Sequence, residues 1–115
     1  MADKYHMIAE ELRGPARELR SEIPEVLKGY AQLHAAATAE GVLSKKMKEL
    51  IALAISVVNK CDGCISSHAR AAAIQGASRD EVAEAIGVAI MLSGGPGTVY
   101  GPRAFEAFLE YQESR

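Results

Sequence analysis

An all-α fold is predicted from three observations: the composition, the spacing of apolar residues and the placement of turn residues. The 115 residues are rich in Ala, Leu, Glu and Lys, which favour helices, and no segment shows the alternation typical of a strand. Turn residues separate segments with helical periodicity, so we expect a compact bundle of about five or six helices. A chain of this length forms one domain, residues 1–115, and is too short for separate cofactor and substrate domains.

The first part of the chain predicts two main helices. One apolar face marks the first helix: Tyr5, Ile8, Ala9 and Leu12. This helix is expected to end at Gly14–Pro15, and a short segment over residues 16–22 follows it. Pro24 suits the first position of a second helix that runs to about Glu40. Gly41 is expected to end that helix in the left-handed conformation.

The middle of the chain predicts a pair of helices joined by a short break. Ser44 is a suitable N-cap for a helix over residues 45–58. The next helix is expected to begin at Cys61 or Asp62 and to stop at Gly76. Two helices with so short a connection can pack antiparallel.

The last part predicts two further helices. Ser78 and Glu81 have the spacing of a capping box, which begins a helix that reaches Leu92. Residues 94–97, Gly-Gly-Pro-Gly, are expected to form a flexible break. The final helix follows this break and is either kinked at Pro102 or starts there.

Two of the helices are apolar on nearly every side. The segments 50–58 and 82–92 lack the single apolar stripe of a surface helix. A domain this small has difficulty burying two such helices alone, and its many alanines allow close helix packing, so we expect a homo-oligomer. The alternative is that other helices of the same subunit cover both segments.

Charge and hydropathy exclude several classes of partner. The net charge is −2 and basic residues are spread along the chain, so no basic face is expected to bind nucleic acid. The most apolar window, residues 50–58, is about half the length that a membrane span requires. The amino terminus lacks the pattern of a secretory signal, so a cytoplasmic location is expected. In that reducing compartment a purely structural disulfide is less expected than a catalytic or metal site.

The two cysteines and a nearby histidine carry the chemistry of the sequence. On a helix, Cys61, Cys64 and His68 share one face. The helix N-terminus favours a thiolate, and this argument points to Cys61, which we expect to be the more exposed cysteine. A thiolate could attack a peroxide oxygen to form a sulfenic acid, which the second cysteine would condense into a disulfide.

Three other titratable residues, Glu49, His6 and His34, are expected from their positions to be exposed to solvent. Glu49 lies on the preceding helix and could approach the dithiol, but its position alone predicts a solvent-exposed side chain near a helix N-terminus. His6 and His34 are far from the motif in sequence and are expected to be solvent-exposed.

These motifs resemble a known family. The pattern of Glu49, Cys61-x-x-Cys64 and His68 is similar to the signature of the alkylhydroperoxidase D (AhpD) type in the carboxymuconolactone decarboxylase superfamily. The run over residues 41–54 and the turns at Gly76-Ala77-Ser78 and Gly94-Gly95-Pro96 share the resemblance, which covers roughly residues 24–102.

The resemblance implies a helical subunit that assembles into trimers or hexamers and reduces small hydroperoxides. Cys64 would attack the peroxide and Cys61 would resolve the sulfenic acid, while Glu49 and His68 would relay protons. No bound cofactor is implied. A dithiol such as dihydrolipoamide, carried by a lipoyl-bearing or other reductant protein, would reduce the disulfide as co-substrate. The chain departs from the well-described peroxidases at Gly63, where they carry a histidine.

Four alternatives stay open. The dithiol could serve a general thiol–disulfide oxidoreductase without strong peroxidase activity. A carboxymuconolactone decarboxylase-like enzyme is less expected, because that branch lacks the dithiol. The side chains of Cys61, Cys64, His68 and Glu49 could instead bind zinc, although a structural zinc site usually has a second Cys or His pair. Finally, the thiols could be buried structural groups of a non-catalytic oligomer.

Overall fold

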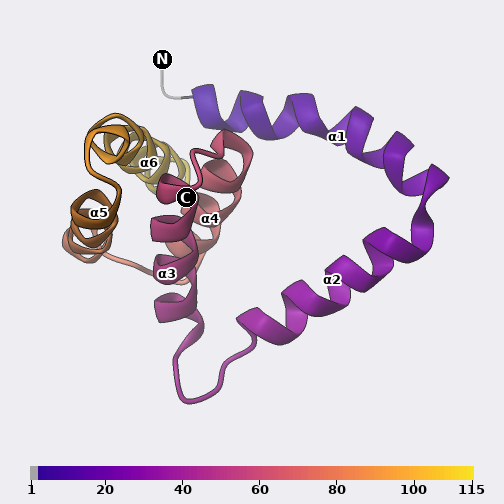
Figure 1. Cartoon of the computed structure of the whole chain (residues 1–115), viewed down its shortest axis with the longest axis horizontal. Helices are drawn as coiled ribbons and strands as arrows, with labels where there is room; N and C mark the ends of the chain where they lie inside the picture. Colours follow the sequence, from indigo (N-terminus) through magenta and orange to yellow (C-terminus); the bar gives the residue numbers. More distant parts are fainter. Residues whose placement is uncertain (1–2) are drawn as a thin grey trace.

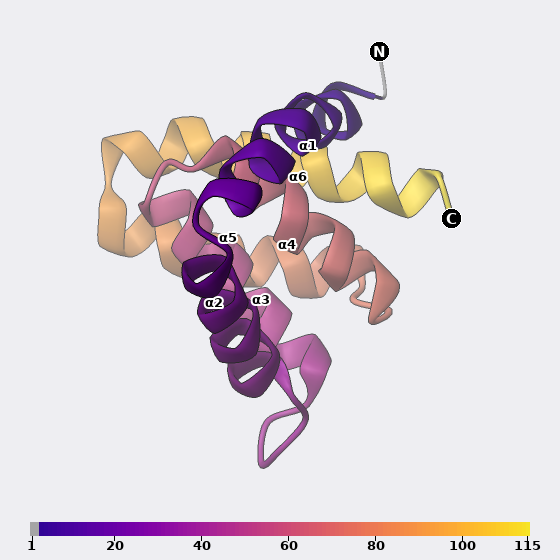
Figure 2. The same cartoon turned by 90° about the vertical axis from the view of Figure 1, so that its right-hand side faces the viewer.

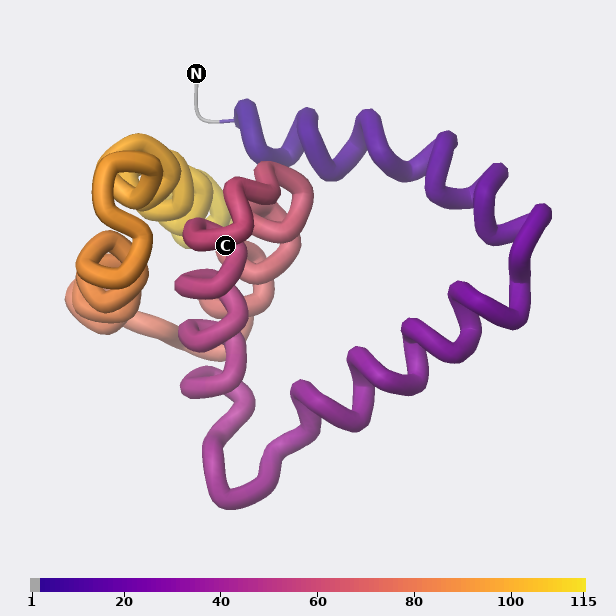
Figure 3. Tube along the Cα trace, in the orientation of Figure 1, coloured from indigo at the N-terminus to yellow at the C-terminus, as the bar shows by residue number. Residues whose placement is uncertain are grey.

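The computed structural model describes residues 3–115, and within them the fold is all-α, as predicted. The helices are α1 (Lys4–Glu22), α2 (Pro24–Thr38), α3 (Lys45–Val58), α4 (Asp62–Ile74), α5 (Arg79–Ser93) and α6 (Gly95–Glu113). Figure 1 shows two parts: α3 to α6 pack into a bundle, whereas α1 and α2 form a bent arm (residues 4–38) that leaves the bundle and returns at the start of α3. The Cα trace in Figure 3 follows the same path.

The bundle forms because each of its four helices buries an apolar face. In the bundle α6 packs against α4 and α5, and α3 packs against the same two helices. The large core side chains are fully or almost fully buried: Leu53, Val57, Ile65, Val82 and Phe108. Burying a side chain of this size contributes about 1.5–3 kcal/mol. Small residues let the helices approach closely: Ala69, Ala72, Ala73, Ala104 and Ala107.

The predicted helix caps are confirmed. The Ser44 hydroxyl accepts a hydrogen bond from the Met47 N–H at 3.1 Å at the start of α3. Ser78 and Glu81 form the capping box that begins α5. Gly76 has a φ of 79°, so it ends α4 in the conformation that only glycine adopts without cost. These local signals place α3, α4 and α5 within the bundle.

Two predicted breaks in the arm are wrong. The first helix does not end at Gly14–Pro15 but continues to Glu22. Proline removes one backbone hydrogen bond there, and because residues 9–22 are exposed, water can bind the unpaired carbonyl group. Gly41 does not take the left-handed conformation either. The chain leaves α2 through Ala39, which is extended with φ −63° and ψ 146°.

The break before α6 is shorter than predicted. Only Gly94 interrupts the two helices, with a φ of 67°. Pro96 lies in the first turn of α6, where a missing N–H costs nothing, and α6 then continues through Pro102. The predicted flexible loop over residues 94–97 is therefore a single-residue turn.

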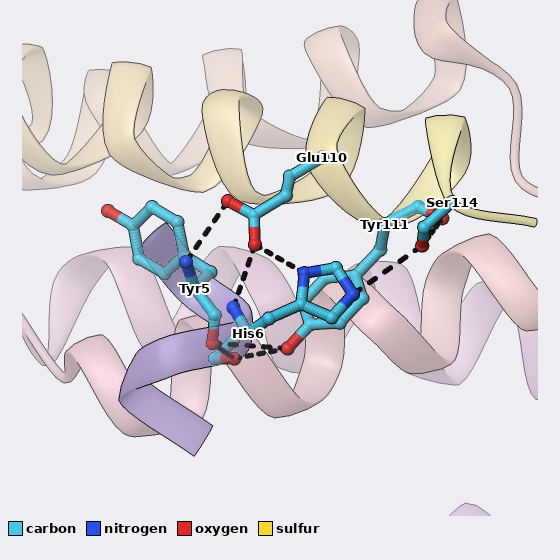
Figure 4. Close-up of polar contacts among 6 residues, drawn as sticks. Tyr5, His6, Glu110, Tyr111 and Ser114 are labelled. Atoms are coloured by element: carbon cyan, nitrogen blue, oxygen red, sulfur yellow. Dashed lines mark hydrogen bonds and ion pairs between the residues drawn. The ribbon is translucent and has the colours of Figure 1, made fainter. Parts of the chain in front are cut away.

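The start of the arm is fixed to the end of the bundle (Figure 4). The Glu110 carboxylate accepts hydrogen bonds from the backbone N–H of Tyr5 at 3.0 Å and of His6 at 2.7 Å, and it lies 2.5 Å from His6 Nδ1. The Tyr111 hydroxyl donates to the Tyr5 carbonyl, and the Ser66 hydroxyl donates to the same oxygen. The prediction of a solvent-exposed His6 holds in part: 40% of its side chain is exposed, but its Nδ1 pairs with the buried Glu110.

Glu110 is buried in this contact between α1 and α6 and still carries a negative charge. Burial raises the pKa of Glu110, but the Tyr5 and His6 N–H groups and the His6 ring outweigh this effect and hold the pKa below its ordinary value. Beyond Ile8 almost every residue of the arm is exposed. Seen from the side of the arm, α1 and α2 cross in front of the bundle (Figure 2).

Candidate functional site

The dithiol lies at the corner between α3 and α4. Lys60 has a φ of 54° and turns the chain, and Cys61 follows in an extended conformation as the N-cap of α4. Cys61 and Cys64 form a disulfide with their Cα atoms 5.2 Å apart. The Cys61 sulfur also accepts a hydrogen bond from the Cys64 N–H at 3.2 Å. The sequence therefore placed both thiols at a helix N-terminus correctly.

The expected difference in exposure between the two cysteines is reversed. Cys61 is half-buried, because its N–H bonds to the Ser56 carbonyl and holds the residue against the end of α3. Cys64 projects from the first turn of α4 and is exposed. The helix N-terminus thus favours a thiolate at Cys61, whereas the greater exposure favours Cys64 as the cysteine that reacts first. An approaching small molecule meets Cys64 first.

Glu49 and His68 form an ion pair across α3 and α4. Glu49 Oε1 lies 2.7 Å from His68 Nδ1, and the ring N–H donates to the carboxylate. The expectation of a solvent-exposed Glu49 is wrong, because only 6% of the residue is exposed. A buried carboxylate requires a partner, and the packing of α3 on α4 supplies the imidazole. The bond fixes the ring tautomer, so Nε2 is left free to exchange a proton.

The ion pair and the disulfide share one helix face. Cys64 and His68 are one turn apart on α4, so their side chains are neighbours on its surface. The four residues singled out in the sequence thus lie on α3, on α4 and in the turn between them. The arrangement combines an exposed sulfur, a second sulfur bonded to it and a histidine oriented by a carboxylate.

Asp62, between the cysteines, lies in a polar cluster that the sequence did not reveal. Its Oδ2 is 3.7 Å from Arg103 Nη1 of α6. Within residues 3–115 its Oδ1 and the Tyr5 hydroxyl are buried without a hydrogen-bond partner. Burial, and then the charge of Asp62, raises the pKa of Tyr5 to about 12. These residues are distant in sequence, so no local pattern could have joined them.

His34 of the arm also approaches the site. Its ring lies nearly parallel to that of His68, with an interplanar angle of 17° and a centroid separation of 6.0 Å. The ring centroid of Tyr30, one turn earlier on α2, is 6.4 Å from that of His34. His34 is exposed, as predicted, but it is not remote from the motif.

Residues 3–115 contain neither a cluster of metal-binding side chains nor a membrane-spanning helix. Among residues 3–115, no three His, Cys, Asp or Glu side chains come together as a group that could hold a metal ion. In the same range, no helix is both long and apolar enough to cross a bilayer.

The sequence matches the profile of the carboxymuconolactone decarboxylase family over residues 24–110. The chain belongs to this family. A crystal structure of an apo carboxymuconolactone decarboxylase family protein from Legionella pneumophila superposes with a TM-score of 0.92 and 39% identity, covering 96% of this chain and 98% of that one.

Other proteins show graded similarity to this carboxymuconolactone decarboxylase family member. A Thermotoga maritima protein, whose description names the antioxidative response as a candidate role, superposes with a TM-score of 0.70 and 32% identity, over 84% of this chain and 88% of that one. An uncharacterised protein of Cupriavidus necator is 35% identical over 74% of this chain and 75% of its own length. An alkyl hydroperoxide reductase AhpD of Anaeromyxobacter is 45% identical, but over 43% of this chain and 26% of that protein.

Gly63 marks this chain's departure from the AhpD-type signature, and the arm covers the position. A Cβ atom at Gly63 would lie 3.1 Å from Cδ1 of Leu12 in α1. A longer side chain there would have to displace Leu12. The arm of this carboxymuconolactone decarboxylase family member therefore meets the motif at two points, through α1 at Gly63 and through α2 at His68.

A separate apolar groove lies between α3 and α5. It has a volume of about 570 Å³ and is lined mainly by apolar side chains, among them Leu50, Ile51, Ile55, Val88 and Leu92. Ile51, Ile55, Val88 and Leu92 are exposed in the isolated subunit. The sequence indicated this surface, because segments 50–58 and 82–92 of these two helices are apolar on nearly every side.

Proposed function

We propose that the chain is a thiol-dependent hydroperoxide reductase whose dithiol cycles through the Cys61–Cys64 disulfide. The observation that carries this proposal is the exposed disulfide at the start of α4, one helical turn from a histidine that a buried carboxylate orients. The family membership and the partial similarity to an AhpD protein support it.

The reaction starts from the reduced dithiol. The Cys64 thiolate attacks the terminal peroxide oxygen; the O–O bond breaks, and the alkoxide that leaves takes a proton from His68 and departs as an alcohol. Cys64 is now a sulfenic acid. His68 then takes the proton of the Cys61 thiol, and the Cys61 thiolate attacks the Cys64 sulfur. The S–O bond breaks, and the leaving hydroxide takes this proton from His68 and departs as water, which forms the disulfide and completes the two-electron reduction of the hydroperoxide. Glu49 stabilises the imidazolium form of His68 during these proton transfers.

A dithiol donor closes the cycle. Exchange between the disulfide and dihydrolipoamide, free or on a lipoyl-bearing protein, returns both thiols and leaves the donor as a cyclic disulfide. Such a cycle needs a donor pool that is kept reduced, and we therefore place the activity in the cytoplasm. No bound cofactor takes part in these steps.

A steady-state assay tests the proposal. Consumption of a small alkyl hydroperoxide with dihydrolipoamide as reductant is expected for the wild-type protein and not for Cys64→Ser. The absence of consumption by the wild-type protein would reject the peroxidase proposal. If disulfide exchange with dihydrolipoamide persisted in that case, the function would be that of a general thiol–disulfide oxidoreductase.

Gly63 is the observation that favours this second candidate. The position directly before Cys64 carries no imidazole, so one proton donor of the AhpD-type signature is missing. Disulfide exchange needs only a thiolate and an accessible sulfur, whereas peroxide reduction also needs a proton for the leaving oxygen. His68 alone has to supply that proton here.

We also propose that the subunit forms a homo-oligomer, a trimer or hexamer, through the groove between α3 and α5. Large apolar side chains of two neighbouring helices are exposed along the groove, among them Ile51, Ile55, Val88 and Leu92. A second copy covering it with its own apolar helices would remove that surface from water. Light scattering coupled to size exclusion is expected to show an oligomer for the wild-type protein and a smaller species for Val88→Glu.

A further inference from the structure

We propose that His34, on the arm, is a positioning residue for His68 in the dithiol reaction. This inference deepens the proposed function and rests on it, because it assigns a role to a residue outside the motif. The relevant geometry is the near-parallel contact between the two imidazole rings, at 6.0 Å and 17°.

The contact bridges two helices that are otherwise separate. Within residues 3–115, the backbone of α2 approaches only α1 and the start of α3, and has no close approach to α4. The end of α2 is held there by a hydrogen bond from Lys48 Nζ of α3 to the Ala39 carbonyl, at 2.6 Å. The His34 side chain thus spans the space between α2 and α4.

The hydrogen bond to Glu49 does not by itself fix the plane of His68. That bond holds the Nδ1 edge, but the terminal torsion of a histidine has a broad minimum, so the ring can still swing about the bond. A second ring on its face limits this motion. It keeps Nε2, the nitrogen that exchanges protons, in one direction on the face that carries Cys64.

The geometry favours positioning over proton transfer between the two histidines. No hydrogen bond joins their ring nitrogens among the described residues, and the two ring planes are nearly parallel. The Tyr30 ring is also near His34, with the ring centroids 6.4 Å apart.

A second contact between the arm and the motif supports the same role. Leu12 of α1 lies over Gly63, as His34 of α2 lies over His68. Both helices of the arm therefore cover the motif with a side chain. We therefore expect the arm to form part of the active site.

The test measures the reactivity of the reduced thiols, which does not depend on peroxide turnover. We would follow the alkylation rate of reduced protein with iodoacetamide at neutral pH in the wild type, His34→Ala, His34→Phe and His68→Ala. Gln32→Ala, at an exposed position on the same helix, is the matched control. His34→Ala is expected to slow alkylation by about two- to tenfold, the range that an aromatic contact supports.

Two further comparisons separate positioning from other roles. His34→Phe keeps an aromatic face and is expected to react within about twofold of the wild type. In the His68→Ala background, His34→Ala is expected to have no added effect, because its action passes through His68.

If the thiols of His34→Ala were alkylated at the same rate as those of the wild type, the proposal would be overturned. An equal loss in His34→Phe, or an undiminished loss in the His68→Ala background, would also overturn it. The peroxide assay decides the proposed function separately.

Discussion

Replacing Glu49 with glutamine removes the charge of the relay and keeps the shape of the side chain. The variant should leave the packing of α3 on α4 intact, because the amide has nearly the volume of the carboxylate. The His68 ring would then face a neutral group at a distance that is 2.7 Å in the wild type. Its imidazolium form would lose a charge-assisted hydrogen bond.

The size of the effect follows from the burial of the pair. Solvent screens it little, since 9% of the Glu49 side chain and 19% of the His68 side chain are exposed. A hydrogen bond to a charged group contributes about 1.5–3 kcal/mol, and about 1.4 kcal/mol corresponds to a factor of ten. The variant should therefore lower kcat/KM for a hydroperoxide by roughly ten- to 150-fold.

The chain contains a matched control for this experiment. Glu110 is also buried and also pairs with a histidine, but it fixes α1 to α6 and does not touch the dithiol. Glu110→Gln is expected to lower the free energy of unfolding by about 1–3 kcal/mol without a comparable loss of kcat/KM. A Glu49→Gln protein that turned over hydroperoxide at the wild-type kcat/KM would refute the reasoning.

Three further predictions follow from single contacts. Cys61→Ser and Cys64→Ser should each abolish turnover with dihydrolipoamide, and a residual rate above the uncatalysed one in both variants would contradict the cycle. The free energy of unfolding should fall as the pH drops below about 4.5, because Glu110 has a lowered pKa in the folded state and the unfolded chain takes up the proton first; an unchanged acid slope in Glu110→Gln would contradict this. Gly63→Ala should raise the thermal midpoint, because alanine favours the helix by up to about 1 kcal/mol and the exposed Leu12 side chain can move; a lower midpoint would mean that the contact is rigid.

The parts of the fold that depend on local chemistry could be predicted from the sequence. Ser44, Ser78 and Gly76 each fix a helix end through a contact within a few residues, and all three ends are where the sequence placed them. Proline was misleading at Pro15, which lies inside α1, because the loss of one backbone bond is smaller than the gain from continuing the helix. Pro102 lies inside α6, which agrees with one of the two alternatives left open for it.

The site could be predicted only as far as the motif reached. The helical spacing of Cys64 and His68 placed them on one face, and the family resemblance added Glu49. The position of Glu49 in the sequence gave no sign of its burial, which depends on the packing of α4 against α3. His34 could not be found either, because the arm brings it back to His68 from another helix.

A single-turnover experiment tests the central claim most directly. The reduced protein, freed of reductant, would be mixed with an equimolar alkyl hydroperoxide, and peroxide and free thiols would be followed together. We predict that each subunit consumes about one equivalent of peroxide and loses both thiols, with an intrachain Cys61–Cys64 disulfide as the product. Peroxide loss no faster than in Cys64→Ser, with both thiols still free, would contradict the account.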